Sequence, residues 1–84
     1  DEPMDDAESP DHHLIQDENV RQLRWALDKL SADHREILVL REMQDLAYEE
    51  IAEVLEISIG TVRSRLSRAR DALKQHLETL PDYR

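Results

Sequence analysis

Arginine and hydroxyl side chains alternate with apolar ones along residues 58–70, SIGTVRSRLSRAR. A guanidinium group can donate two hydrogen bonds to guanine or to phosphate, and a hydroxyl group can bond a base edge or a phosphate. At about 100° per residue, Val62, Leu66 and Ala69 fall on one side of a helix, with most arginines and serines opposite or beside them. The spacing therefore predicts a helix with one buried face and one face suited to bind nucleic acid.

The position of each side chain around this helix predicts its role. Side chains opposite the apolar face are expected near base edges or adjacent phosphates, because small serines allow close approach and arginine can bond guanine. Side chains on the flanks suit the phosphates of the groove walls. The first set is Arg63, Ser64, Ser67 and Arg68, the second is Arg65 and Arg70, and Ser58 and Thr61 at the helix start complete the predicted DNA-binding residues. A solvated basic face without a ligand is the alternative, but a short helix and a turn before it favour a helix-turn-helix unit.

The net charge of −9 would ordinarily argue against nucleic-acid binding. The charges are unevenly distributed, however: residues 1–18 contain eight acids and no Lys or Arg, whereas residues 59–74 contain five bases and one acid. Because salt confines the field of a charge to about 10 Å, the local charge of the DNA-binding element decides. The acids of residues 1–18 serve either as a simple linker, the favoured hypothesis, or as competitors of DNA for the basic helix.

Length and composition limit the architecture. Eighty-four residues suffice for one small domain, and the lack of cysteine excludes disulfides and thiolate zinc sites. There is no apolar run of about 20 residues, as a membrane span requires, and no signal-peptide pattern. We therefore expect a cytoplasmic protein with no membrane partner. The chain starts at Asp1 without an initiator Met, which suggests a fragment of a longer protein.

The apolar spacing predicts an all-α fold, a compact four-helix domain containing a helix-turn-helix. Its helices are expected at residues 17–29, 32–43, 48–55 and 59–77, the last three joined by short connections, with Ser31 and Ser58 as N-caps. Residues 1–16 are expected to form a disordered acidic linker, and residues 17–80 the domain. The residues predicted to face the core are Val20, Leu23, Leu27, Leu30, Ile37, Leu38, Leu40, Met43, Ile51, Ala52, Leu55, Val62, Leu66, Ala69 and Leu73.

Other side chains could carry chemistry but form no convincing site. Trp25 lies opposite the apolar side of the first helix, where it either packs on Leu14 or Ile15 or marks a partner surface. His12 and His13 lack the spacing and the scaffold of a metal site. Because the chain has no nucleophile–base pair, no Gly-rich phosphate loop and no ligand cluster, we expect no enzyme activity, no catalytic residue, no cofactor and no metal.

Three segments resemble region 4, the C-terminal domain of bacterial sigma factors of the extracytoplasmic-function (ECF) type: ALDKLSADHREILVLRE at 26–42, YEEIAEVL at 48–55 and IGTVRSRLSRARDAL at 59–73. The resemblance covers about residues 20–77. It implies a domain that binds double-stranded promoter DNA at the minus-35 element and docks on the beta flap of the RNA polymerase core. By position, the base-proximal contacts of the family map onto Arg63, Ser64, Ser67 and Arg68. An anti-sigma factor commonly holds such proteins inactive, so the resemblance also implies that partner.

The sequence departs from the family pattern at three positions. Glu56 stands where the family usually has Gly, Ser58 where it often has Pro, and Ala47 where it often has Ser or Thr. Glu56 is expected to add strain to a left-handed turn, and Ala47 to remove a capping box with Glu50. The region that recognises the minus-10 element is absent, so this chain alone is not expected to start transcription.

Two other functions fit parts of the sequence. The DNA-binding domain of a LuxR-type response regulator has a similar four-helix layout, but GTVRSRLSRAR and LSADHRE favour the sigma factor. A module that binds polymerase or an anti-sigma factor, with only incidental DNA contact, is the alternative from another class. Binding to a minus-35 duplex, compared with a scrambled duplex, would separate the three.

Overall fold

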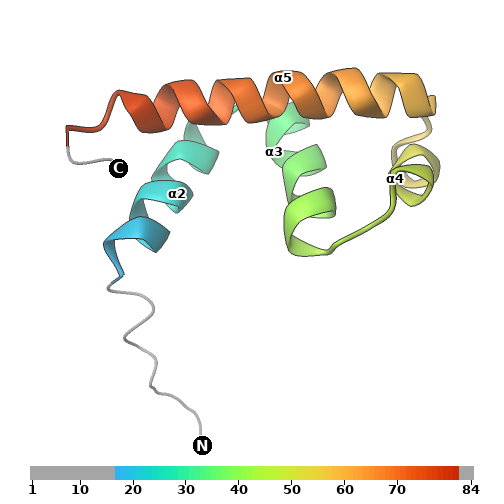
Figure 1. Ribbon diagram of the computed structural model, residues 1–84. Helices are drawn as coiled ribbons and strands as arrows, with labels where there is room; N and C mark the ends of the chain where they lie inside the picture. Colours follow the sequence, from blue (N-terminus) through green and yellow to red (C-terminus); the bar gives the residue numbers. More distant parts are fainter. Residues whose placement is uncertain (1–16, 82–84) are drawn as a thin grey trace, which may run out of the picture.

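The computed structural model describes residues 17–81. In this range the chain forms helices α2 (Glu18–Lys29), α3 (Ala32–Leu38), α4 (Tyr48–Leu55) and α5 (Ile59–Glu78), with a π-helical segment, η1 (Val39–Met43), continuing α3. The long α5 lies across one side of the shorter helices, and α4 lies beside its N-terminal end (Figure 1). No strand occurs in residues 17–81, so the all-α prediction is confirmed.

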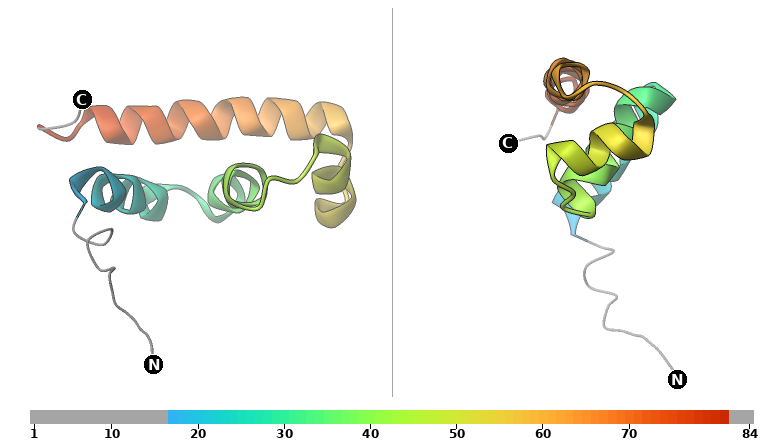
Figure 2. Two further views of the ribbon diagram at one scale, coloured as in Figure 1. Left: turned by 60° about the horizontal axis from the view of Figure 1, so that its bottom comes forward. Right: turned by 90° about the vertical axis from the view of Figure 1, so that its right-hand side faces the viewer.

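The two further views show the same layering, with α2, α3 and α4 together on one side of α5 (Figure 2). Each of these three helices packs against α5, which makes α5 the common partner of the domain. At 20 residues, α5 is long enough to contact all of them and still present an outer face along its whole length. The helix that carries the predicted DNA-binding side chains is therefore also the helix against which the other three pack.

Side-chain caps fix three of the helix starts. The Asp17 carboxylate accepts the N–H of Asn19 at 2.8 Å. The Ser31 hydroxyl accepts the N–H of His34 at 3.3 Å, and the Ser58 hydroxyl accepts that of Thr61 at 3.1 Å. Each cap satisfies a backbone donor that the first helical turn leaves free. The helix starts expected at residues 17, 32, 48 and 59 are accordingly found within one residue.

The expected second helix, 32–43, is only partly α-helical. From residue 39 the backbone widens into η1, where the Gln44 N–H bonds the Val39 carbonyl five residues back at 3.0 Å. One residue more per turn rotates the following side chains away from their α-helical positions. Met43, which was predicted to face the core, is therefore 59% exposed.

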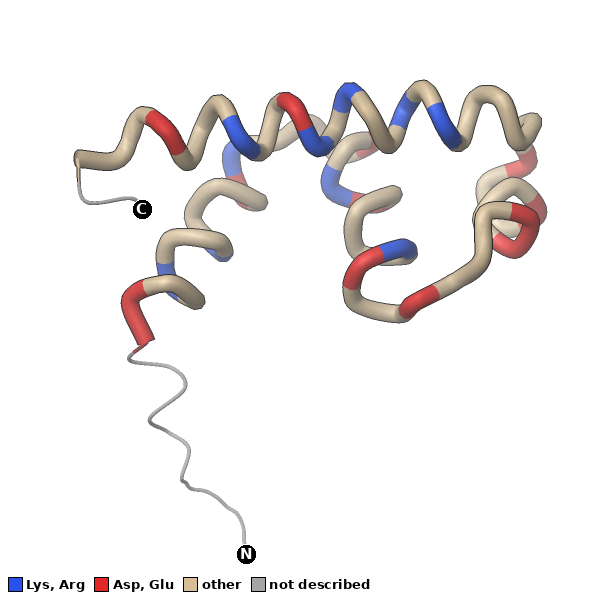
Figure 3. The backbone as a smooth tube through the Cα atoms, in the orientation of Figure 1, with Lys and Arg blue, Asp and Glu red and all other residues tan. Residues whose placement is uncertain are grey.

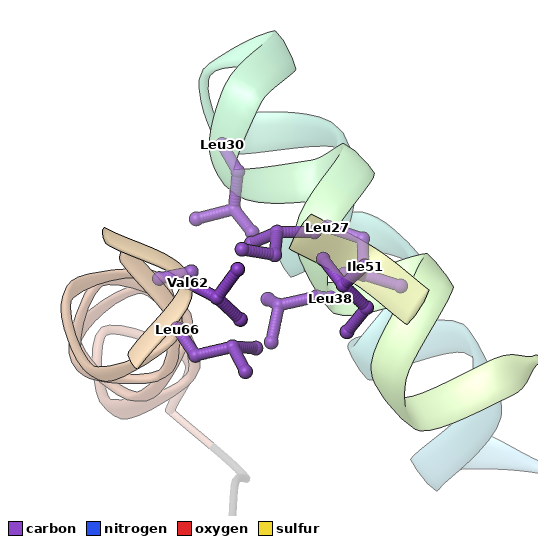
Figure 4. Close-up of a cluster of buried hydrophobic side chains, with 8 residues drawn as sticks. Leu27, Leu30, Leu38, Ile51, Val62 and Leu66 are labelled. Carbon is purple, nitrogen blue, oxygen red and sulfur yellow. The ribbon is translucent and has the colours of Figure 1, made fainter. Parts of the chain in front are cut away.

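The core gathers apolar side chains of every α-helix around α5. Leu27 of α2, Leu30 directly after α2, Leu38 of α3 and Ile51 of α4 point toward Val62 and Leu66 (Figure 4). Ala26, Ile37, Ile51, Val62 and Ala69 have no measurable exposed surface. The core predicted for the last helix is thus confirmed at Val62, Leu66 and Ala69, while Leu73 is half-buried.

The predicted buried face of the first helix was wrong at its N-terminal end. Val20 and Leu23 are 37% and 39% exposed, whereas Gln22 and Ala26 are buried in their place. Leu23 was predicted to be buried only because of its spacing from other apolar residues. The direction in which α2 crosses α5 decides which side of α2 is buried. Helix spacing predicts that one face is apolar but not how far along the helix it is buried.

Two residues adopt the left-handed conformation without being glycine. Glu56 has φ 58° and ψ 47°, and the N–H of Ile57 returns to the Ala52 carbonyl at 3.0 Å, which ends α4. The tight turn expected here therefore forms despite the side chain. Asp45, with φ 58°, is a second such position in the connection 44–47, and the sequence did not indicate it.

Several sequence predictions lie outside the described residues: the linker over 1–16, the histidine pair at 12 and 13, and packing by Leu14 and Ile15. Of the eight N-terminal acids only Asp17 and Glu18 are described; the first caps α2 and the second pairs with Arg21 at 2.6 Å. None of the helices within residues 17–81 is long and apolar enough to cross a membrane.

Candidate nucleic-acid interface

Three hydroxyl side chains form hydrogen bonds at the start of α5. Ser58 accepts the Thr61 N–H and donates its own hydrogen to the Thr61 hydroxyl oxygen at 2.9 Å. Ser64 donates to the Thr61 carbonyl at 3.3 Å. With this arrangement the Thr61 hydroxyl keeps a hydrogen to donate, and the Ser64 oxygen keeps lone pairs to accept. These groups lie beside the free N–H groups of a helix N-terminus, which favour an anion such as phosphate.

The outward face of α5 carries two exposed arginines and two exposed serines. Arg63, Ser64, Ser67 and Arg68 lie opposite the buried Val62, Leu66 and Ala69, as expected from the spacing. In the part of the chain that the structure describes, neither Arg63 nor Arg68 forms an ion pair. Both side chains are exposed on this face of α5. Arg65 is half-buried on one flank of the helix.

Positive and negative charges are segregated between the two helices of the helix-turn-helix. Figure 3 shows only Lys and Arg on the part of α5 nearest α4, acids farther along α5, and Asp and Glu on α4 and the turn that follows it. Glu49, Glu50 and Glu53 are exposed on α4, and Glu56 is exposed in the turn. A polyanion that approached the domain would be attracted by the outer face of α5 and repelled by α4.

Arg70 differs from the other predicted DNA-binding arginines, because it is already paired. Its Nη2 and Nε atoms donate to the same oxygen of Glu42, Oε2, at 2.7 and 3.2 Å. Hydrogen bonding to Glu42 raises the pKa of Arg70 above its usual value; burial opposes this rise, and Tyr48 adds to it. The sequence did not indicate this contact, since Glu42 lies 28 positions away and no local pattern joins the two residues.

A groove separates α2, η1 and α5 on another side of the domain. Its volume is about 260 Å³. Its lining consists of Leu23, Leu27, Leu38, Met43 and Leu73, with Glu42 and Arg70 as the charged residues. The spacing predicted that Leu23 and Met43 lie in a closed core. They are exposed instead and line an apolar concave surface.

The predicted packing of Trp25 on Leu14 or Ile15 lies outside the described residues, and within them Trp25 contacts α5. Its ring meets the edge of His76, on α5, with ring centroids 6.4 Å apart and an interplanar angle of 86°. The Lys29 ammonium lies 5.4 Å from the centre of the same ring. Trp25 therefore contributes a contact between α2 and the C-terminal part of α5, and the residue is 36% exposed.

The chain is similar in sequence to known proteins. The family described as "Sigma-70, region 4" matches residues 21–73. RNA polymerase sigma-H factor of Pseudomonas aeruginosa is 40% identical over 80 residues, which cover 95% of this chain and 42% of the relative. An ECF RNA polymerase sigma-E factor of Haemophilus influenzae is 33% identical over 75 residues (89% of this chain, 40% of the relative). RNA polymerase sigma factor YlaC of Bacillus subtilis is 41% identical over 70 residues (83% and 40%).

The chain spans about two-fifths of the length of these curated relatives. The matched range includes α3, η1, α4 and most of α2 and α5, so it contains both the outward face of α5 and the groove. The family match decides against the response-regulator alternative. The chain belongs to the sigma-70 region 4 family, as a region 4 domain of the ECF type.

Proposed function

We propose that this chain is the promoter-recognition module of an ECF sigma factor and binds the minus-35 element with α5 in the major groove. The observation that carries the proposal is the outward face of α5, where Arg63 and Arg68 are exposed with no ion pair in residues 17–81. An α-helix fits the major groove, and an arginine there can bond guanine O6 and N7 together.

The surroundings of α5 support this docking geometry. Helix α4 packs against the start of α5 through Ile51, which is fully buried, as the bracing helix of a helix-turn-helix does. Thr61 and the free N–H groups of the first turn are placed for a phosphate at the groove edge, and Arg65 for one on a groove wall. Repulsion by the acids of α4 disfavours docking with α4 in the groove.

The groove between α2, η1 and α5 is proposed as the surface that docks on the beta flap of the polymerase core. Half-exposed leucine and exposed methionine side chains suit an apolar segment of another protein, because Met adapts its shape to the surface it meets. An anti-sigma factor is the further partner of the proposal. A module that binds promoter DNA and polymerase acts in the cytoplasm and needs no enzyme activity of its own.

Selection from a library of duplexes tests the DNA-binding part. The 84-residue chain would be used to enrich duplexes with a randomised central region, and the enriched duplex compared with a scrambled version of equal composition. Specific binding should exceed non-specific binding by about 10³-fold or more, and the enriched sequence should recur about 35 base pairs upstream of transcription starts. Equal affinity for both duplexes would contradict the proposal.

The pure protein-interaction module remains the second candidate, and the apolar groove is the observation that favours it. The isolated beta flap, titrated with the same chain, separates the two functions. Binding to the flap together with sequence-specific DNA binding supports the first proposal. Binding to the flap without any preference between duplexes supports the second.

A further inference from the structure

We propose that Arg70 is a positioning residue for DNA recognition: through its ion pair with Glu42 it holds α5 at a fixed angle against η1, and it does not bind phosphate. The inference rests on the proposed function and refines it, because sequence spacing placed Arg70 among the phosphate ligands. It also gives Glu42, an acid outside the helix-turn-helix, a role in DNA binding.

The pair joins two elements that are distant in the sequence. Arg70 lies in α5 and Glu42 in η1, and two nitrogens of the guanidinium group share one carboxylate oxygen. The other ion pair of the described residues, Arg21–Glu18, lies within a single helix turn and cannot orient one helix against another. Glu42–Arg70 is therefore suited to set the relation between the recognition helix and the rest of the domain.

Neighbouring side chains extend the pair into a four-residue polar cluster: Arg41, Glu42, Tyr48 and Arg70. The Arg41 guanidinium lies 5.3 Å from the centre of the Tyr48 ring and donates to the Leu46 carbonyl at 2.7 Å. Tyr48, the first residue of α4, also raises the pKa of Arg70. The polar cluster thus links η1, the connection to α4, α4 itself and α5. A helix-turn-helix requires this relation to be fixed, since base contacts tolerate little misplacement.

Charge argues against a phosphate at Arg70. A phosphate within reach of this guanidinium would also lie close to the Glu42 carboxylate, and the two anions would repel each other. Arg65, on the opposite flank, has no ion pair within residues 17–81 and meets no such obstacle. Arg70 also lies eight residues beyond Val62, about 12 Å along the helix axis, and so toward the end of the predicted contact region.

Salt dependence of DNA binding separates a positioning role from a phosphate contact. Each phosphate contact that is lost lowers the slope of log affinity against log salt by about 0.9. The affinity of the full chain for the enriched duplex would be measured at several salt concentrations, for the unchanged chain and for Arg70→Ala, Arg70→Lys and Glu42→Gln. A charge exchange, Glu42→Arg with Arg70→Glu, completes the set. Arg65→Ala is the matched control for a phosphate ligand.

The proposal expects Arg70→Ala and Glu42→Gln to weaken binding by a similar factor, about two- to fivefold for a half-exposed pair, with the salt slope unchanged. The charge exchange should restore most of the affinity, and Arg70→Lys should restore little, because Lys lacks the planar fork. Circular dichroism of each variant checks that the helices form; Glu42→Gln, nearly identical in shape, tests the pair even where an Arg70 variant fails to fold.

Other results would overturn the inference. A slope lowered by about 0.9 in Arg70→Ala, with Glu42→Gln binding as well as or better than the unchanged chain, would make Arg70 a phosphate ligand. Failure of the charge exchange to restore affinity would remove the positioning role. A chain that binds enriched and scrambled duplexes equally contradicts the proposed function instead, and the slopes measured on the scrambled duplex still decide whether Arg70 contacts phosphate.

Discussion

The two sides of α5 are built on opposite principles. At the N-terminal half of α5, apolar side chains are fully covered by α3 and α4, and charged or hydroxyl groups face outward. Beside the C-terminal half, α2 and η1 leave Leu23, Met43 and Leu73 around an open groove. We call these the helix-turn-helix side and the groove side. The first offers charge to a polyanion and the second offers apolar surface to a protein, so the two proposed partners would bind different surfaces of one small domain.

The two sides should differ most in stability. Ile51→Ala and Leu66→Ala remove fully buried side chains from the helix-turn-helix side, and each should lower the free energy of unfolding by about 2–5 kcal/mol. Leu23→Ala, at a residue that is 39% exposed on the groove side, should lower it by less than about 1 kcal/mol. Urea unfolding followed by circular dichroism measures all three. Equal losses for Leu23 and Ile51 would mean that the groove is part of the core.

Apart from the Glu42–Arg70 pair in the groove lining, only substitutions on the helix-turn-helix side should change DNA affinity. Arg63→Ala or Arg68→Ala should weaken binding to the enriched duplex by about 1–3 kcal/mol and relax the base preference at one position. Arg24→Ala, which removes an exposed arginine from α2, makes the same change in net charge and is the matched control. Fluorescence anisotropy with duplexes substituted at single positions gives both affinity and preference. If all three variants lost the same DNA affinity, the loss would come from the change in net charge and not from contacts of Arg63 and Arg68.

Binding to the polymerase flap should show the reverse pattern. Met43→Glu places a charge in the apolar groove and should weaken binding of the isolated flap by more than about 1 kcal/mol, without changing DNA affinity. Val54→Glu is a close control, because Val54 is 57% exposed and Met43 59%, but Val54 lies on α4 outside the groove lining. Calorimetric titration of both variants compares them directly. Flap binding that is weakened only by Val54→Glu would move the docking surface to α4.

A smaller effect is expected at the start of α4, where the cap is incomplete. The Ala47 N–H already donates to the Glu50 carboxylate at 2.8 Å, but Ala47 has no side-chain oxygen to accept a backbone N–H in return. Ala47→Ser supplies that oxygen on a backbone that is already extended, and should raise the free energy of unfolding by about 0.5–2 kcal/mol. Ala47→Val, which adds no oxygen and is not a favoured N-cap residue, is the control. A urea midpoint no higher for Ser than for Val would rule out the completed capping box.

Local sequence was sufficient for the helix-turn-helix side and insufficient for the groove side. Ser58 caps α5, and Glu56 makes the left-handed turn, within a few residues of the signals that predicted them. The exposure of Leu23 depends instead on how α2 crosses α5, and that of Met43 on the π-helical turn in η1. Both are set by packing between distant segments, as is the pairing of Arg70. Helical spacing predicted the direction in which the Arg70 side chain points, but it could not predict that Arg70 is paired with Glu42.

The smallest effect that distinguishes the two sides concerns Trp25, the only tryptophan of the chain. Its edge-to-face contact with His76 ties α2 to the C-terminal part of α5, beyond the region that α3 and α4 cover. Such pairs contribute about 0.5–1.5 kcal/mol, and the partial exposure of Trp25 places this one toward the lower value.

His76→Ala should therefore lower the free energy of unfolding by about 0.5 kcal/mol and shift the Trp25 emission to longer wavelength as water reaches the ring. His34→Ala, at a half-buried histidine of α3, should leave the emission unchanged. If the emission maximum of His76→Ala matches that of the unchanged chain, His76 does not shield the Trp25 ring from water, and the proposed contribution of this contact is contradicted.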